Sequence, residues 1–211
     1  MGEMPAKVVP LPSARPGPSS PPSPPLGELS DEDLMRLVRA GSREAMTTLA
    51  ERYVRPLTSF CAKRTGDAGA AEDIVQEVLL RLWRRRAEWQ PRGRVKALVY
   101  TAALNLCRNS ARNSRRRGLW MSAAPLDLEV AQRTAPASDV EELLVRERVR
   151  DARRALAELP EPMREALLLR FDAEISYEDI AAIVGAPEST VRSRVHHALL
   201  RMRASVREEE R

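Results

Sequence analysis

The sequence predicts an all-α fold of two helical domains joined by a flexible linker, the C-terminal domain containing a helix-turn-helix. Leucine, alanine, arginine and glutamate recur at helical spacing over long runs, whereas aromatic residues make up only 4% of the chain and Gly-rich strand signals are missing. Residues 118–138 are rich in proline and small residues, as expected of a linker between two such runs. The 211 residues are enough for one or two small domains.

The positive charge is modest in sum but concentrated in one block. Lysine and arginine number 35 against 30 acids, so the net charge is +5. No acid occurs from Trp89 to Leu126, and that block holds Arg92, Arg94, Lys96, Arg108, Arg112, Arg115, Arg116 and Arg117. Such a segregated basic block predicts binding to a polyanion.

Several function classes are disfavoured by what the sequence lacks. Cys61 and Cys107 lie far apart without a Cys-x-x-Cys motif, and the adjacent His196 and His197 cannot share a helix face. We therefore expect no metal, no cofactor and no catalytic site, and two buried free thiols in a reducing cytosol. No apolar run approaches a membrane span and no secretory core begins the chain, so the expected location is cytoplasmic, without membrane insertion.

Order is predicted to begin at Ser30. Residues 1–29 hold nine of the 16 prolines and predict a disordered tail. Ser30 can cap a helix that runs to about Arg39, and Ser42 opens a longer helix in which Pro56 predicts a kink or a restart. The expected core face of that second helix consists of Ala45, Leu49, Tyr53, Leu57 and Phe60.

Asp67 caps the next predicted helix, at about residues 68–86. Its core face consists of Ala71, Ile74, Val75, Val78 and Leu82, and its outer face of Glu72, Asp73, Gln76, Glu77 and Leu80. An acidic face beside an exposed leucine either binds a basic protein surface or is simply solvated, and the residues alone do not decide between the two.

A further helix is predicted at residues 95–116, after a polar loop that contains Trp89. Its expected apolar stripe is Val95, Leu98, Val99, Ala102, Ala103 and Leu106, and the opposite stripe is Asn105, Arg108, Asn109, Arg112 and Arg116. Arginines beside amides on one face suit phosphate contacts combined with hydrogen bonds to base edges.

The C-terminal domain is predicted at residues 139–205, with Ser138 and Glu141 as the capping box of a helix that ends near Glu158. The 21-residue linker before it, fully extended, reaches ~70 Å at ~3.3 Å per residue. That reach matches about two helical turns of duplex DNA at ~3.4 Å per base pair.

A helix-turn-helix is predicted at residues 176–201. Ser176 caps a short helix, Gly185 can supply the positive φ that ends it, and Pro187 cannot continue it. A longer helix follows, with Val191, Val195, Ala198 and Leu199 on the buried side and Ser189, Thr190, Arg192, Ser193, Arg194 and His197 on the open side. The open side suits phosphates and the acceptor edges of guanine, although a solvated basic face is the alternative.

Three motifs together resemble the extracytoplasmic-function class of bacterial RNA polymerase sigma factors. The order "LxxLP…REALLLR…SYEDIA…G.P.STVRSR" is similar to the fourth sigma region, the segment "AEDIVQEVLLRLW" at residues 71–83 to the second, and "VKALVYTAALNLCRN" at residues 95–109 to its strand-melting part. The last segment departs from the family pattern, because Val95 and Leu98 stand where aromatics are usual.

The resemblance implies a sigma factor with region 2 at residues 30–117 and region 4 at residues 139–205. By resemblance, core RNA polymerase binds Asp73, Gln76, Glu77 and Leu80; the melted −10 strand binds Tyr100, Asn105, Arg108, Asn109 and Arg112; and the −35 duplex binds the open side of the last helix. Tyr100 could instead be a core aromatic. The further partners implied are promoter DNA and an anti-sigma factor. A stand-alone helix-turn-helix regulator is the alternative, but it leaves residues 72–83 and 105–112 unexplained.

Overall fold

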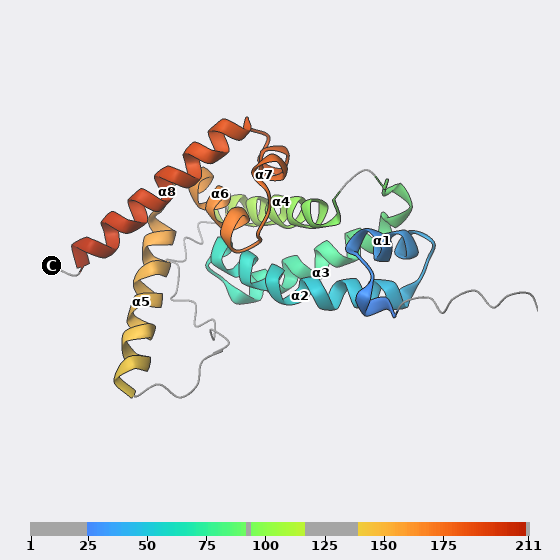
Figure 1. Cartoon of the computed structure of the whole chain (residues 1–211), viewed down its shortest axis with the longest axis horizontal. Helices are drawn as coiled ribbons and strands as arrows, with labels where there is room; N and C mark the ends of the chain where they lie inside the picture. The colour runs from blue at the N-terminus through green and yellow to red at the C-terminus, as the bar shows by residue number, and fades with distance from the viewer. Residues whose placement is uncertain (1–24, 92–93, 117–138, 210–211) are drawn as a thin grey trace, which may run out of the picture.

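The structure, a computed structural model, describes residues 25–91, 94–116 and 139–209, the side chains of 114–116, 139–144 and 206–209 excepted. Over these residues the chain is helical, with no strand, so the predicted all-α class is confirmed (Figure 1). Both the linker prediction, residues 118–138, and most of the predicted N-terminal tail fall outside the described residues.

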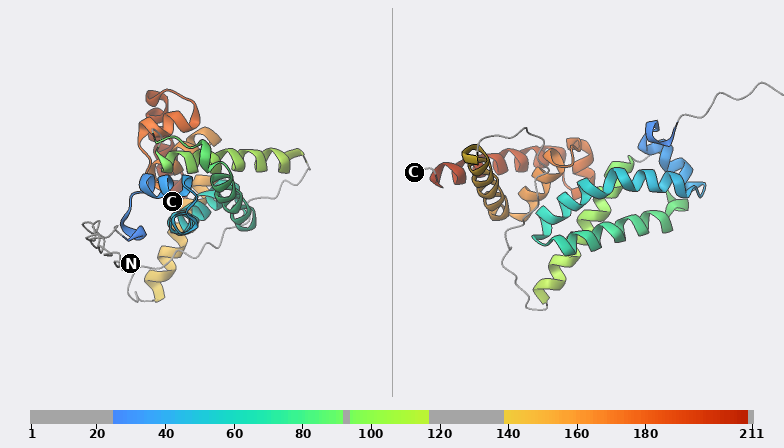
Figure 2. Two further views of the ribbon diagram at one scale, coloured as in Figure 1. Left: turned by 90° about the vertical axis from the view of Figure 1, so that its right-hand side faces the viewer. Right: turned by 90° about the horizontal axis from the view of Figure 1, so that it is seen from below.

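The first helical unit is built from two 3-10 turns and four α-helices. Their bounds are η1 Leu26–Glu28, α1 Asp31–Arg39, α2 Arg43–Thr65, α3 Ala68–Arg84, η2 Arg86–Glu88 and α4 Val95–Arg116. Helices α2 and α3 pack side by side and α4 lies against both, as Figure 2 shows from below. Helix α2 continues through Pro56 as one element.

The second unit contains α5 Asp139–Glu158, α6 Glu161–Phe171, α7 Tyr177–Val184 and α8 Glu188–Glu209. Helix α8 packs against α5, α6 and α7. The pair α7–α8 forms the predicted helix-turn-helix. Gly185 ends α7 at a φ of 68°, the left-handed conformation that glycine adopts without steric cost.

Serine and aspartate side chains begin the helices where the sequence predicts. Ser30, Ser42 and Ser176 each accept a hydrogen bond from the backbone N–H three residues later, at 3.1 Å. Asp67 does the same for α3. Each cap satisfies one of the N–H groups that the first turn of a helix leaves without a partner.

The predicted core faces of α2 and α3 are confirmed, whereas that of α4 is rotated. Its buried side chains are Val95, Val99, Tyr100, Ala103, Leu104 and Cys107, and Leu98 is 43% exposed. Helix α4 contacts α1, α2, α3 and α7, so its buried face is set by neighbours on more than one side rather than by the apolar stripe alone.

The predicted start of order at Ser30 is also too late. Leu26 and Leu29 pack against the core, and the Arg52 guanidinium donates to the Gly27 carbonyl at 2.6 Å. Two apolar side chains and one charged hydrogen bond thus fix a segment whose proline content suggested a tail.

The two units are packed against each other. Helix α4 contacts α7, and α2 contacts α6, with α6 and α7 lying between α8 and the first unit (Figure 1). None of the helices described is long and apolar enough to span a bilayer.

Candidate nucleic-acid interface

The open side of α8 begins at the turn of the helix-turn-helix. Ser189, Arg192, Ser193 and His197 are exposed there, while Thr190 and Arg194 are half-buried. Val191, Val195 and Ala198 are buried on the opposite side, as predicted. The helix therefore presents hydroxyl, imidazole and guanidinium donors outward from a fixed apolar seam, which is the arrangement that a helix in a major groove requires.

Arg192 is held in place before any ligand binds. Its Nε and Nη2 donate to Glu188 Oε1 at 2.9 and 2.5 Å, and its guanidinium lies 4.3 Å from the centroid of the Tyr177 ring. Arg170 lies over the same ring at 5.0 Å. Tyr177, which the sequence analysis did not select, thus contacts Arg192 across the turn through a cation–π interaction.

The predicted stripe on α4 contains exposed side chains and one side chain that is bound to a residue of the second unit. Asn105, Asn109 and Arg112 are exposed. Arg108 is only partly exposed and donates from Nε and Nη2 to the two carboxylate oxygens of Glu165, at 3.0 and 2.6 Å. Arg116 lies on α4, although its side chain falls outside the described residues. One member of the stripe is therefore bound to the second unit.

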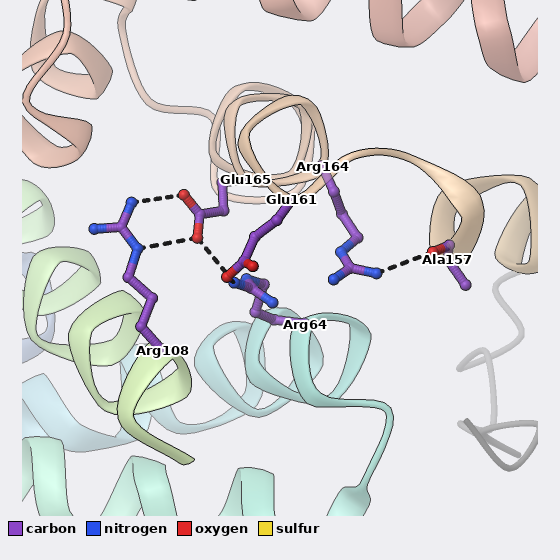
Figure 3. A network of polar contacts seen from close by, with 6 residues as sticks. All are labelled: Arg64, Arg108, Ala157, Glu161, Arg164 and Glu165. Atoms are coloured by element: carbon purple, nitrogen blue, oxygen red, sulfur yellow. Dashed lines mark hydrogen bonds and ion pairs between the residues drawn. The ribbon is translucent and has the colours of Figure 1, made fainter. Parts of the chain in front are cut away.

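Glu165 on α6 is the centre of a buried network between the two units (Figure 3). It also accepts from Arg64 Nη2 on α2, at 2.9 Å, and Arg64 pairs in addition with Glu161. The side chains of Arg64 and Glu165 are 3% and 4% exposed. Buried charges at this depth need partners of opposite sign, and each of these has one.

The network fixes the protonation state of Glu165. Burial on its own would raise the pKa of this carboxyl, but hydrogen bonds and charge from Arg108 and Arg64 outweigh burial and hold the pKa below its ordinary value. The hydrogen bonds that Arg108 donates to Glu165 in turn raise the pKa of Arg108. The carboxylate is thus ionised across the neutral pH range.

A hollow of about 350 Å³ opens beside this network. It is lined by Arg108, Ala111, Arg112, Glu161, Pro162 and Glu165. Two guanidinium groups from α4 and two carboxylates from α6 line it, so the polar stripe of α4 and the second unit share one cleft.

The outer face of α3 lies where the sequence predicts. Asp73 and Gln76 are exposed, Glu77 is half-buried and pairs with Arg81 at 2.6 Å, and Leu80 is 46% exposed. The opposite side of the helix packs against α2 and α4. These four side chains thus lie on the side of α3 that faces away from its packing against α2 and α4.

Tyr100, assigned to the −10 strand by resemblance, lies in the core, which was the alternative left open for it. Its ring is 1% exposed and meets the Phe60 ring edge-on at a centroid distance of 5.2 Å. Burial, followed by the nearby charges of Asp172, Cys61 and Glu174, raises the pKa of its hydroxyl. Trp89, the other candidate aromatic, is also buried. Base stacking on either ring is excluded in this arrangement.

The residues that the sequence analysis missed belong to the junction between the units. Besides Arg64 and Glu165, Lys63 pairs with Asp172, and Arg94 pairs with Asp179. These partners lie 85 to 109 positions apart in the sequence. No local pattern marks them, because each reads as one more surface charge on an amphipathic helix.

No group of three or more histidine, cysteine, aspartate or glutamate side chains in the described part of the chain could hold a metal ion. The two cysteines, on α2 and α4, are buried free thiols. A mutual hydrogen bond lowers the pKa of Cys107 and raises that of Cys61.

Comparison with known proteins gives matches for both units. The family model of Sigma-70 region 2 matches residues 49–117, and that of Sigma-70 region 4 matches residues 150–202. The RNA polymerase sigma-H factor of Pseudomonas aeruginosa is 27% identical over 177 residues, which cover 82% of this chain and 92% of the relative. The ECF RNA polymerase sigma factor EcfG of Rhodopseudomonas palustris is 32% identical over 151 residues, covering 72% and 79%.

Among solved structures, the sigma factor RpoE from Bartonella quintana, in complex with the anti-sigma factor NepR, has a TM-score of 0.56 to this chain. The two sequences are 25% identical, and the likeness covers 73% of this chain and 91% of the other.

Proposed function

Because the chain belongs to the extracytoplasmic-function class of bacterial RNA polymerase sigma factors, we propose that it directs core RNA polymerase to specific promoters through three separate surfaces. One observation carries this proposal: both sigma regions are matched in chain order, and each matched unit presents an exposed polar helix face. The chain acts as a DNA-binding initiation factor, and the polymerase supplies the chemistry. It works in the cytoplasm, beside the chromosome.

The second unit reads the −35 element as duplex DNA. The first turns of α8 enter the major groove, where Arg192 and Arg194 contact guanine edges or phosphates and Ser189, Thr190, Ser193 and His197 complete the contacts. Arg192 exchanges Glu188 for DNA when it binds. Tyr177 keeps the guanidinium in place during that exchange, since its ring contact does not use the N–H donors.

The first unit captures the −10 element as a melted strand. Asn105 and Asn109 read base edges, while Arg108 and Arg112 contact phosphates. Capture requires bases to leave the stack, because their pairing edges are unavailable inside a duplex. An Asn105→Ala, Arg112→Ala variant is expected to reduce permanganate reactivity of the −10 region more than it reduces initial promoter binding. Normal melting by this variant would mean that the stripe is only a solvated face.

The outer face of α3 binds core RNA polymerase. Asp73, Gln76 and Glu77 offer acceptors and charge around the exposed Leu80, a combination that fits a basic protein surface. Replacing Asp73 and Gln76 by alanine is expected to weaken core binding while circular dichroism remains unchanged, since neither side chain enters the core. A loss of helix content would instead assign these residues a structural role.

We propose a dedicated anti-sigma protein as the third partner, since the relative RpoE was solved in complex with one. Such a protein would cover residues 72–80 and exclude core polymerase. Purification of the chain from resting cells should therefore yield a small partner at equal stoichiometry. Recovery of polymerase alone would contradict this part of the proposal.

A reconstituted transcription assay tests the function as a whole. Core polymerase, a promoter template and this chain should give promoter-specific transcripts that core polymerase alone does not give. A stand-alone helix-turn-helix regulator would shift duplex DNA by itself and leave core polymerase inactive on the same template. The second outcome would refute the sigma function and leave only the activity of the helix-turn-helix.

A further inference from the structure

The contacts between the two units have one electrostatic polarity. In each of five ion pairs that join them, the cation belongs to the first unit and the carboxylate to the second. The cations are Lys63, Arg64, Arg94 and Arg108, and the carboxylates are Glu161, Glu165, Asp172 and Asp179. The second unit therefore presents to the first a surface of fixed anions, which is also how a nucleic-acid backbone presents itself.

Glu165 binds Arg108, a side chain that the proposed function assigns to contact with DNA. Its two oxygens accept a pair of hydrogen bonds from Arg108, in the fork geometry that guanidinium also forms with phosphate (Figure 3). Arg112 lines the same hollow. A strand that needs Arg108 must displace the second unit from this position.

The helix-turn-helix and the α4 stripe also lie too close together to bind both promoter elements at once. The −35 and −10 elements are separated by ~70 Å, about two turns of duplex at ~3.4 Å per base pair. Here the helix-turn-helix lies directly against α4, through contacts of α7 and the pair Arg94–Asp179. Both elements cannot be bound unless the units separate.

An ionic junction suits separation better than an apolar one. Arg64 and Glu165 lose hydration in the closed arrangement and regain it on opening, so their mutual attraction and their desolvation largely cancel. Lys63 and Arg94 remain partly exposed, and exposed pairs contribute little. The ion pairs of the junction therefore add little to the cost of separating the units.

We propose that this junction is an autoinhibitory contact, in which the second unit covers part of the −10 stripe until promoter and polymerase hold the units apart. The inference rests on the proposed function, whose −10 stripe it regulates. In the free chain the Glu165-centred network keeps the closed form in the majority, and DNA selects the open form.

A charge swap at the periphery of the junction provides the test, because Lys63 and Asp172 lie outside all three proposed binding surfaces. In the full chain, Lys63→Glu and Asp172→Lys are each expected to open the structure, seen as a larger radius of gyration in small-angle X-ray scattering. The double variant restores opposite charges and should close again. Arg55→Glu is the matched control, since this exposed side chain on the same helix lies away from the junction and its reversal changes the net charge by the same amount.

The same variants are then titrated with a single-stranded −10 oligonucleotide. Opening a form that is about nine-tenths closed should raise the apparent affinity about tenfold, in proportion to the competent fraction. Equal radii for wild type and both single reversals would overturn the closed junction. Opening without a gain in affinity would overturn the inhibitory role. If the radii changed as expected but no form bound the oligonucleotide, the proposed −10 function would be refuted, and the inhibitory role would be refuted with it. The closed junction would still be supported.

Discussion

The interface between α2 and α3 and the junction between the two units differ in the interactions that form them: apolar packing in the first and ion pairs in the second. Leu57, Phe60, Val75 and Val78 lie in the first and are nearly inaccessible to solvent. The second is organised by guanidinium, ammonium and carboxylate groups. Separating apolar surfaces exposes them to water at about 25 cal/mol per Å², whereas separated ions are rehydrated. The interface between α2 and α3 is therefore the more costly of the two to separate.

Breaking the apolar side of the comparison should have the largest effect. Phe60→Ala removes a fully buried ring and its edge-on partner contact with Tyr100, so the free energy of unfolding is expected to fall by ~3–5 kcal/mol. Urea denaturation measures the change. Lys63→Gln, three residues later on the same helix, is the control and should change it by less than about 1 kcal/mol. Similar losses in the two variants would remove the distinction between the two contacts.

The open side of α8 should respond independently of the junction, because none of the five ion pairs described there involves a residue of α8. Arg192→Ala and Arg194→Ala are each expected to weaken binding to a −35 duplex by ~1–3 kcal/mol if the arginine makes a bidentate contact with guanine. Fluorescence anisotropy with a labelled duplex measures the loss. In a Lys63→Glu background the losses should agree within ~0.5 kcal/mol. A strong dependence on that background would tie α8 to closure.

Two matched helix caps sharpen the comparison further. Ser176 and Ser30 cap α7 and α1 in the same way, but only Ser176 also accepts from Arg94 across the junction, at 3.2 Å. Alanine at either position should lower the free energy of unfolding by ~1 kcal/mol. Only Ser176→Ala should also enlarge the chain in X-ray scattering. Equal radii for the two variants would show that the Arg94–Ser176 hydrogen bond contributes nothing to closure, since the Arg94–Asp179 pair remains in both.

Local signals account for the parts of the structure that the sequence predicts well. Capping serines, Gly185 and the apolar periodicity of α2 and α3 depend on residues within about two turns of one another, and the structure confirms them. The exposed polar faces of α3 and α8 follow from the same periodicity. Their roles in binding stay predictions.

The failures occur where a helix has neighbours on several sides. The buried face of α4 extends to Tyr100 and Leu104 because α4 packs against helices of both units. The apolar stripe of α4 itself does not predict those neighbours. The junction is invisible for the same reason. Glu165 carries the ordinary pattern of a helical surface glutamate, and only the fold places it between Arg64 and Arg108.

Acid should open the junction while the apolar core remains, which is the smallest effect expected and the sharpest separation of the two contacts. The pKa of Glu165 is lowered in the closed form because Arg108 and Arg64 outweigh the cost of its burial. The closed form therefore binds the proton less readily than the open form, in which Glu165 titrates near its ordinary value of 4.5. It follows that this contribution to closure is fully present above that value and is lost as the pH falls through the lowered pKa.

X-ray scattering on acidification from pH 7 should thus show a constant radius above the ordinary carboxyl pKa of 4.5 and an increase once the pH falls through the lowered pKa of Glu165, with helical circular dichroism retained at first. Glu165→Gln is the control, because an amide has no proton to gain, and its radius should already be large at neutral pH. The amide removes the anion that Arg64 and Arg108 share, so the central ionic contribution to closure is lost, while Arg64–Glu161, Lys63–Asp172 and Arg94–Asp179 remain. A Glu165→Gln chain as compact as wild type at pH 7 would show that the remaining contacts hold the units together without this carboxylate.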